Sequence, residues 1–351
     1  MSDPIPVGSG TAGIALALRA LSPGRGWVAT SPTVCANVVA AILAGGRRPL
    51  FIDIERTTLG LDPELLRAEV SNVDAVIAVH PLGELCQIQE IADVCRAAGV
   101  PLIEDCAQAE GATDADGLPV GSRGNVAVFS YGAGKILDLG GGGLVHANSA
   151  DLRTRIVAQT AVLGDDTDAA QAALDALSRG YKRLYNQSYP KFGKDQIDTF
   201  ADLLRDAAET GIVAPERDTV ERATRARRAL QDVVAARRRH QQIYREILTG
   251  ISGLQFLPVS LGGVPWRFSI WLDSEWRDRV LKQMLAMGKK VSSWHPDITP
   301  FLRPDMYRSR ALPNSAWYSG GVLNFWLDQT MTEDDVIAAG HEARSFILAA
   351  A

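Results

Sequence analysis

The chain has 351 residues, of which 46% are hydrophobic and 22% are charged. This length accommodates two domains, or one large domain with an appendage, around a sizeable core. The formal net charge of −5 excludes a general attraction to nucleic acid or to anionic membrane surfaces.

Targeting and redox features of the sequence favour a cytoplasmic protein. No apolar run approaches the length of a membrane span, and the N-terminus lacks the basic and apolar segments of a secretory signal. The four cysteines, Cys35, Cys86, Cys95 and Cys106, show neither a metal-binding spacing nor a paired framework. This usage fits a reducing cytoplasm, and we expect neither disulfides nor a bound metal.

The motif GSGTAG at residues 8–13 matches the glycine pattern of a dinucleotide-binding turn. That interpretation needs a strand before the turn and an acidic residue about 20 residues after it. Two early prolines argue against the strand, and the first acidic candidate, Asp53, lies much further along. NAD binding is therefore disfavoured. Two interpretations stay open: a turn that offers N–H groups to another anion, or a plain helix cap by Ser9 or Thr11.

The first half of the chain alternates strands and helices. Short, continuously apolar runs predict strands at residues 26–30, 48–54, 73–80 and 100–105. Amphipathic stretches between them predict helices at residues 35–46, 62–70 and 86–99. This pattern is typical of a mostly parallel sheet covered by helices on both faces, a three-layer αβα domain.

After about residue 150 the pattern changes. Residues 151–215 are mixed and polar, and residues 184–195 are interpreted as a loop. One long helix is expected at residues 216–248, with its arginine run on a solvated face and not bound to nucleic acid. Two strands, a helix and a closing helix are expected after it. We assign residues 1–215 to a large α/β domain and residues 216–351 to a smaller α+β domain.

Ligands in a parallel α/β sheet collect beyond the carboxyl ends of the strands. In this chain those ends hold Asp53, His80, Asp105 and Ser130. With no histidine or second acid at ligand spacing, a metal at Asp105 is not favoured.

Lys135 lies between Gly134 and a run of four glycines, with apolar neighbours, in a place where a solvated lysine has little reason to be. Desolvation disfavours the charged form of such a lysine, and the neutral amine is a nucleophile for carbonyls. The alternative is a plain lysine on a glycine-rich hairpin.

Taken together, these features indicate a particular cofactor more specifically than any one of them does alone. A phosphate-binding turn at a helix start, an aspartate at one strand end, a serine at the next and a lysine five residues later are what pyridoxal 5'-phosphate requires. The lysine forms the Schiff base, the aspartate pairs with the pyridinium nitrogen, and hydroxyls with helix-start amides hold the phosphate.

At these residues the chain resembles the DegT-type (DegT/StrS) sugar aminotransferases, which are fold-type I pyridoxal phosphate enzymes. The resemblance covers most of residues 7–150, and its most specific block runs from Asp105 to Leu144. Matching segments include GSGTAGIALAL, AVHPLGE, PLIEDCAQAEGA and VGSRGNVAVFSYGAGKILDLGGGGLV.

The resemblance implies roles for particular residues. Lys135 is the residue linked to the cofactor, and Asp105 is the partner of its ring nitrogen. Gln108 is expected near the ring hydroxyl. The phosphate is expected to be held by Ser130, Gly10 and Thr11. The opening glycines are thus expected to bind a cofactor phosphate and not NAD.

Some family features lack a clean match here. Cys35 stands where the family often places an aromatic ring against the cofactor. The family also has an asparagine that reaches the phosphate of the partner subunit, and in this chain Lys182 or Asn186 is the candidate. The usual sugar-binding surroundings are therefore in question.

Three further residues are candidates for contact with the substrate. His80 aligns with a histidine common in the family, and a structural or interface role is as open as a catalytic one. Trp294 and His295, in VSSWHP at residues 291–296, either line the mouth of the site or serve packing.

The function that this resemblance implies is transamination, with glutamate or glutamine as the amino donor and a nucleotide-linked keto-sugar as the acceptor. It also implies a homodimer with shared active sites. One alternative keeps the cofactor but acts on a non-sugar substrate, by transamination or elimination. A third possibility is a noncatalytic module that binds pyridoxal phosphate or NAD.

Overall fold

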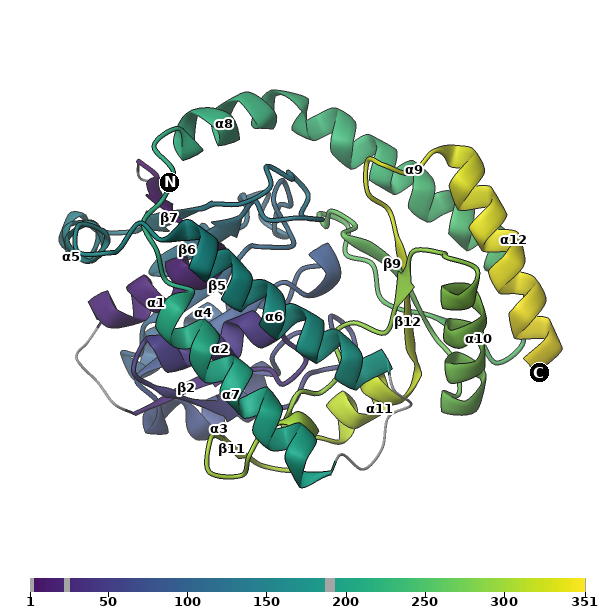
Figure 1. The fold of residues 1–351 in the computed structure, drawn as a ribbon, viewed down its shortest axis with the longest axis horizontal. Helices are drawn as coiled ribbons and strands as arrows, with labels where there is room; N and C mark the ends of the chain where they lie inside the picture. Colours follow the sequence, from purple (N-terminus) through teal and green to yellow (C-terminus); the bar gives the residue numbers. More distant parts are fainter. Residues whose placement is uncertain (1–2, 22–25, 187–192, 351) are drawn as a thin grey trace.

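The computed structural model describes residues 3–21, 26–186 and 193–350, with the side chain of Asn186 left out. An eight-stranded sheet has the order β1-β7-β6-β5-β4-β2-β3-β11. These strands are β1 (Ile5–Val7), β7 (Gly143–Ala147), β6 (Val126–Ser130), β5 (Leu102–Asp105), β4 (Ala75–Val79), β2 (Trp27–Thr30), β3 (Arg48–Phe51) and β11 (Arg308–Ser309). Pairing is parallel from β6 to β11 and antiparallel at β7 and β1, which confirms the mostly parallel sheet (Figure 1).

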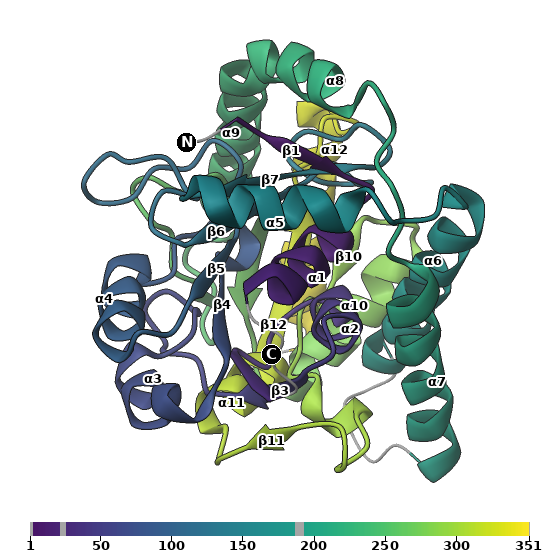
Figure 2. The same ribbon diagram turned by 90° about the vertical axis from the view of Figure 1, so that its left-hand side faces the viewer.

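Helices cover both faces of this sheet (Figure 2). One face carries α1 (Gly10–Leu21), α2 (Ala36–Ala44) and α5 (Ala150–Thr160), and the other carries α3 (Pro63–Glu69) and α4 (Ile88–Ala98). Alternation along β4 explains the two layers, because Ile77 packs with α1 and α2 while Val76 and Ala78 pack with α3 and α4. The expected three-layer architecture is confirmed.

The second half of the chain builds a smaller antiparallel sheet with the order β10-β12-β9-β8. Its strands are β8 (Gln255–Phe256), β9 (Arg267–Trp271), β10 (Val291–Ser292) and β12 (Val322–Trp326). The helices around it are α8 (Thr219–Ala226), α9 (Leu230–Leu248), α10 (Ser274–Ala286) and α12 (Glu333–Ala350). Phe268 and Phe325 pack under α9, α10 and α12, so Arg267 and Asn324, their neighbours along the strands, lie on the opposite face.

The C-terminal part also returns to the large sheet. β11 pairs with β3, and Phe301 lies in the core that includes α1 and α2. Helix α11 (Pro313–Gly321) begins on Asp53, whose carboxylate accepts hydrogen bonds from the N–H groups of Asn314 and Ser315, each at 2.8 Å. The division after residue 215 stays a prediction.

Several local expectations were wrong. A strand, β1, does precede the glycine turn; it lies at the edge of the sheet, where a proline costs little. Residues 151–215 are largely helical, because α6 (Thr167–Asn186) and α7 (Lys194–Thr210) bury their apolar faces against each other and against α2. The expected loop at 184–195 overlaps both helix ends, and residues 187–192 within it lie outside the described residues.

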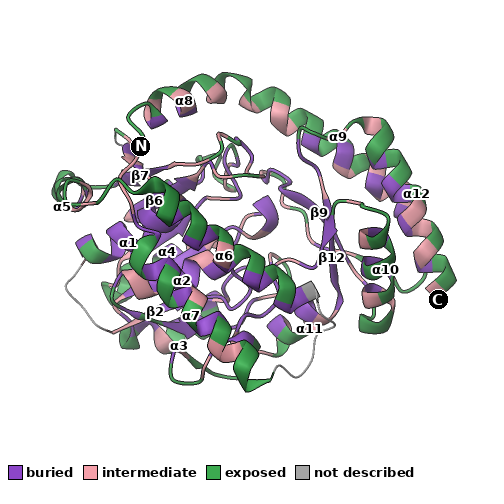
Figure 3. Cartoon of the chain, in the orientation of Figure 1, coloured by how far each residue is buried: buried purple, intermediate pink, exposed green. Residues whose placement is uncertain are grey.

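The long C-terminal helix is confirmed as α8 and α9, joined by a short 3-10 turn, and much of its outer surface is exposed (Figure 3). Arg238 and Arg239 are exposed as expected, but Arg237 is buried. In the described parts of the chain, no helix has the length and apolar character needed to span a membrane.

Candidate active site

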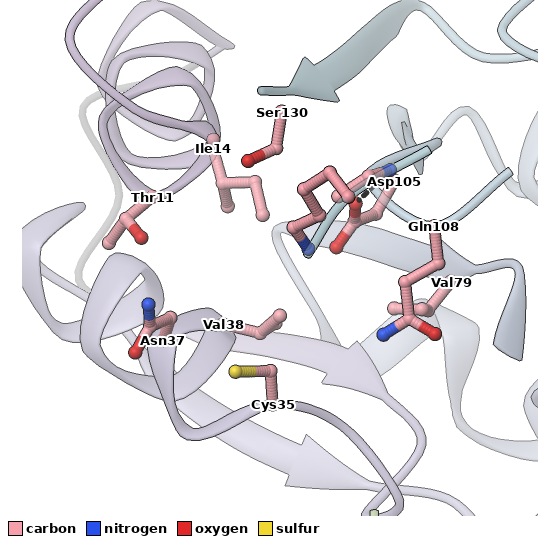
Figure 4. A pocket seen from close by; sticks show the side chains of 12 residues that line it. Thr11, Ile14, Cys35, Asn37, Val38, Val79, Asp105, Gln108 and Ser130 are labelled. Atoms are coloured by element: carbon pink, nitrogen blue, oxygen red, sulfur yellow. Dashed lines mark hydrogen bonds between the residues drawn. The ribbon is translucent and has the colours of Figure 1, made fainter. Parts of the chain in front are cut away.

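The strand ends of the eight-stranded sheet and the helix starts beside them converge on one cavity. Every residue proposed to bind the cofactor lies on its wall. The lining residues are Gly10, Thr11, Ile14, Cys35, Asn37, Val38, Val79, Asp105, Ala107, Gln108, Ser130 and Lys135. Thr11 and Asn37 lie together at one end of the cavity, and Asp105 and Gln108 lie at the other (Figure 4).

Lys135 is held in the cavity by the hairpin between β6 and β7. The carboxylate of Asp138 accepts hydrogen bonds from the N–H groups of Gly134 at 2.8 Å and Gly140 at 2.9 Å. Both glycines have positive φ angles, 76° and 80°, which favour glycine. The hairpin interpretation and the site interpretation are therefore compatible, because a glycine-rich hairpin carries the lysine into the cavity.

The environment of the Lys135 amine shifts its ionisation toward the neutral form. Burial lowers its pKa, and the charge of Arg267 lowers it further, while Cys35 and Asp105 act in the opposite direction. Such an amine loses its proton more readily than a surface lysine and becomes a better nucleophile.

Asp105 ends β5 and is 4% exposed. Its Oδ1 accepts a hydrogen bond from the N–H of Ala107 at 3.0 Å. Burial raises its pKa, and the Ala107 N–H, Lys135 and His80 oppose that shift. A buried carboxylate in these surroundings gains from a cationic partner.

Close approach of α1 to β6 forms the end of the cavity at Thr11. A Cβ added to Gly10 would lie 2.9 Å from the Cβ of Ser130, so glycine is required for this approach. Ser9 caps α1 by accepting from the N–H of Ala12 at 3.0 Å. The preceding N–H groups, at Gly10 and Thr11, have no partner within the helix. The helix-cap interpretation is confirmed for Ser9, whereas anion binding by the turn, which forms part of the cavity wall, stays a prediction.

Asn37 is a lining residue that the sequence did not reveal. It lies in the first turn of α2, whose N-cap, Cys35, makes no side-chain cap hydrogen bond. The Oδ1 atom of Asn37 is buried and has no partner among the described residues. The sequence feature that could have indicated Asn37 is a polar amide in the mostly apolar segment TVCANV, where the helix starts.

Gln108 connects the cavity to the C-terminal part of the chain. Its Oε1 accepts from the N–H of Leu82 at 2.8 Å, and its Nε2 lies 3.1 Å from Nε2 of His295. His295 stacks on Trp294 and on Trp266, with ring centroids 5.1 and 6.0 Å apart. Burial lowers the pKa of His295 to about 3, so its ring is neutral. His295 therefore contacts the wall residue Gln108, and Trp294 stacks on His295, but neither residue lines the cavity itself.

His80 lies behind the cavity and not on its wall. It is fully buried, with Nε2 at 3.1 Å from Oε1 of Glu104 and Nδ1 at 3.5 Å from Sγ of Cys86. Ligand atoms of His80, Glu104 and Cys106 lie within 4.8 Å of one another, a cluster that residue spacing did not predict. The Glu104 carboxylate also accepts hydrogen bonds from the N–H groups of Arg123 and Gly124, so backbone groups outside the cluster satisfy one of its carboxylate oxygens.

The candidates for a partner-subunit contact lie on α6. Lys182 is exposed, and the side chain of Asn186 lies outside the described residues. Between them, Tyr185 is buried; its ring meets Trp294 edge-on at 5.9 Å, and its hydroxyl has no partner among the described residues.

Comparison with known proteins identifies the family. Residues 2–182 match the sequence profile of the DegT/DnrJ/EryC1/StrS aminotransferase family. The chain belongs to this family. The match includes every residue on the cavity wall.

Among curated members of the family, the chain is similar to L-glutamine:2-deoxy-scyllo-inosose aminotransferase of Streptoalloteichus tenebrarius, with 37% identity over 162 residues. This match covers 43% of the chain and 36% of that relative, so the chain spans little more than a third of its length. It is also similar to dTDP-4-dehydro-2,3,6-trideoxy-D-glucose 4-aminotransferase of Saccharopolyspora spinosa, with 29% identity over 85% of the chain and 73% of the relative.

The family fold extends over the whole chain. The crystal structure of the aminotransferase TlmJ from Streptoalloteichus hindustanus superimposes with a TM-score of 0.76 and 23% identity. This superposition covers 99% of the chain and 86% of that structure. The fold-type I architecture expected from the sequence is thereby confirmed.

Proposed function

We propose that the protein is a pyridoxal 5'-phosphate-dependent aminotransferase that moves an amino group from glutamate or glutamine to a keto-sugar. The observation that carries this proposal is the convergence of Lys135, Asp105, Ser130 and the start of α1 on one cavity. An amine with a lowered pKa, a buried carboxylate and a hydroxyl beside free helix N–H groups are the groups that this cofactor requires.

The shape of the cavity supports the choice of cofactor. Gly10 lets α1 approach Ser130 closely enough for its first N–H groups and the Ser130 hydroxyl to bind the same phosphate. Asn37 supplies a second polar group at that end, from the start of α2. Asp105 lies at the other end, where the ring nitrogen would be placed (Figure 4).

When bound, pyridoxal phosphate supplies an electron sink that stabilises negative charge on the amino carbon of the donor. The protein's own groups then have distinct tasks. The Lys135 amine would hold the cofactor and would carry a proton to and from the amino carbon. The Asp105 carboxylate would keep the ring nitrogen protonated, and Gln108, fixed by Leu82 and His295, would bind the ring hydroxyl.

The direct test is chemical trapping. Purified protein loaded with pyridoxal phosphate is expected to be yellow, and borohydride is expected to fix the cofactor on a peptide that contains Lys135. The exposed Lys282 serves as the control site, because it is not on the cavity wall. A colourless protein, or label spread over several lysines, would reject the assignment.

The substrate class is proposed from the relatives. The names of two matched proteins specify an inosose with glutamine, and a dTDP-linked keto-sugar. We expect glutamine or glutamate alone to discharge the yellow colour, and a nucleotide-linked keto-sugar to restore it. If no amino donor discharges the colour while a substrate is dehydrated or decarboxylated, the chemistry is elimination or decarboxylation instead.

Assembly and location complete the proposal. We infer a cytoplasmic homodimer in which Lys182 or Asn186 of one subunit contacts the phosphate of the other. The exposure of Lys182 leaves it available for such a contact. Size measurement in solution tests this directly, and a stable, active monomer would contradict it.

A further inference from the structure

Two buried guanidinium groups lie beside the cavity without an ion-pair partner. Arg237 is 1% exposed and Arg267 is 2% exposed. Both donate from Nη1 to the same carbonyl, that of Trp266, at 3.2 and 2.9 Å, and Arg237 also donates from Nη2 to the carbonyl of Lys135 at 3.3 Å. Within the described residues, the Nε atom of each arginine has no partner and neither arginine forms an ion pair.

Within the described part of the chain, the protein offsets this positive charge only through a carboxylate that forms no ion pair with either arginine. The carboxylate that influences both arginines is Asp328, which is itself 3.5 Å from the amine of Lys290. Burial lowers the pKa of Arg237 to about 10 and that of Arg267 to about 9. A buried charge without a counter-charge is costly, and an anionic ligand would relieve that cost.

Arg267 lies next to the reacting amine. Its Cζ lies 3.9 Å from the centroid of the Trp266 ring, and the Lys135 Nζ lies 5.9 Å from the same centroid. A Cβ added to Gly134, the neighbour of Lys135, would lie 3.7 Å from Nη2 of Arg267. The same Cζ atom of Arg267 also lies 4.1 Å from the centroid of the Trp326 ring, so the guanidinium contacts two indole rings.

Two further buried polar groups near Arg267 also lack a partner among the described residues. They are the hydroxyl of Tyr185 and the Nδ1 atom of His295. Tyr185 and His295 both interact electrostatically with Arg267, and both pack against Trp294. A guanidinium, a phenol and a neutral imidazole, contributed by different elements, therefore lie near one another, and each keeps an unpartnered polar atom.

We propose that Arg267, assisted by Tyr185 and His295, binds the α-carboxylate of the amino donor. This inference rests on the proposed function, because it assigns the donor to the cavity of Lys135. The α-carboxylate is separated from the donor nitrogen by one carbon, so its binding group has to lie beside the lysine, as Arg267 does. The phosphates of a nucleotide-linked sugar are many bonds from the reacting carbon and require a more distant group. A planar guanidinium also matches the geometry of a carboxylate.

The test uses an unreactive ligand and calorimetry on protein loaded with pyridoxal phosphate. Glutarate carries the carboxylates of the donor without its amino group, and glutaramide has the same shape without charge. We expect glutarate to bind the unmodified protein at least about tenfold more tightly than glutaramide. Equal affinity for the two ligands would overturn the proposal without any variant.

Variants then locate the site. Arg267→Gln should weaken glutarate binding by about tenfold or more, and Arg267→Lys, which keeps the charge but not the planar fork, should weaken it less. The matched control is Arg239→Gln, because Arg239 is exposed and pairs with Glu333. Unchanged affinity in Arg267→Gln would overturn the proposal; if that variant does not fold, Arg267→Lys and the glutaramide comparison decide.

The same titrations separate this inference from the proposed function. Each is repeated without the cofactor, and absorbance records whether the cofactor binds. Failure to bind the cofactor together with Arg267-dependent glutarate binding would reject the function but keep the carboxylate site. Cofactor bound at Lys135 with glutarate affinity independent of Arg267 would keep the function and reject the site.

Discussion

Asp105 and Lys135 reach the same cavity from different elements, and each affects the ionisation of the other. Asp105 ends β5, whereas Lys135 lies in the hairpin that follows the neighbouring strand, β6. Burial raises the pKa of the carboxyl and lowers the pKa of the amine, and the attraction between the two groups opposes both shifts. A ligand with a protonated ring nitrogen would give the carboxylate a cationic partner and free the amine for attack.

Replacement of Asp105 is expected to separate attachment of the cofactor from catalysis. Asp105→Ala leaves the Lys135 amine in place, so borohydride should still label Lys135. Turnover should fall about 10²-fold or more, because the charge that keeps the ring nitrogen protonated is lost. Lys135→Ala should instead abolish both labelling and turnover. Equal turnover in Asp105→Ala and the unmodified protein would show that Asp105 does not face the ring nitrogen.

Replacement of Gly10 should damage the phosphate end of the cavity. The Cβ introduced by Gly10→Ala would lie 2.9 Å from Cβ and 3.2 Å from Oγ of Ser130. We expect weaker binding of pyridoxal phosphate and a loss of about 1–3 kcal/mol in the free energy of unfolding, as overpacking typically causes. Fluorescence titration and urea unfolding measure the two effects. Gly141→Ala is the control, since a Cβ there meets no atom within 4 Å and the φ angle is not positive.

Asn37 is predicted to contribute to cofactor affinity. Asn37→Ala should raise the dissociation constant of pyridoxal phosphate by about five- to tenfold, the loss expected for a hydrogen bond to a charged group. Asn37→Asp should weaken binding further, because it places a negative charge beside the phosphate. Equilibrium dialysis gives both constants. Asn72→Ala is the matched control, because Asn72 is exposed and bonds only to Glu69 among the described residues. An unaffected constant in Asn37→Ala would place the phosphate elsewhere.

His295 should make the folded protein sensitive to acid. Burial lowers its pKa from 6.5 to about 3 in the folded protein. Between these values the unfolded chain binds a proton at His295 that the folded chain does not, so the free energy of unfolding falls as the pH falls from 6.5 toward 3.

Substitution at His295 tests that dependence. In His295→Gln, the slope of unfolding free energy against pH should decrease over that range. The decrease should correspond to about one proton fewer taken up on unfolding. His341→Gln, at an exposed position, should not remove this proton. Urea unfolding at a series of pH values measures the slopes, and identical slopes in His295→Gln and the unmodified protein would contradict the prediction.

The sequence by itself determined the large sheet and the main catalytic candidates. Continuous apolar strands separated by amphipathic helices are local signals, and they correctly predicted β2 to β5 with α2 to α4 between them. Because the carboxyl ends of parallel strands meet at one edge of a sheet, Asp105, Ser130 and the segment of Lys135 were expected together, and they line one cavity.

Only the tertiary structure decided which distant residues lie around the site. Asn37, Tyr185 and Arg267 come from α2, α6 and β9, and no local periodicity links these positions. The arginine run of α9 shows what the sequence could not predict. Its three arginines have similar sequence surroundings, but of these only Arg237 is buried and donates hydrogen bonds to the carbonyls of Trp266 and Lys135. Hydrophobic periodicity specifies which face of an element is buried, whereas the partner of that face depends on how distant elements pack, which short segments of sequence do not encode.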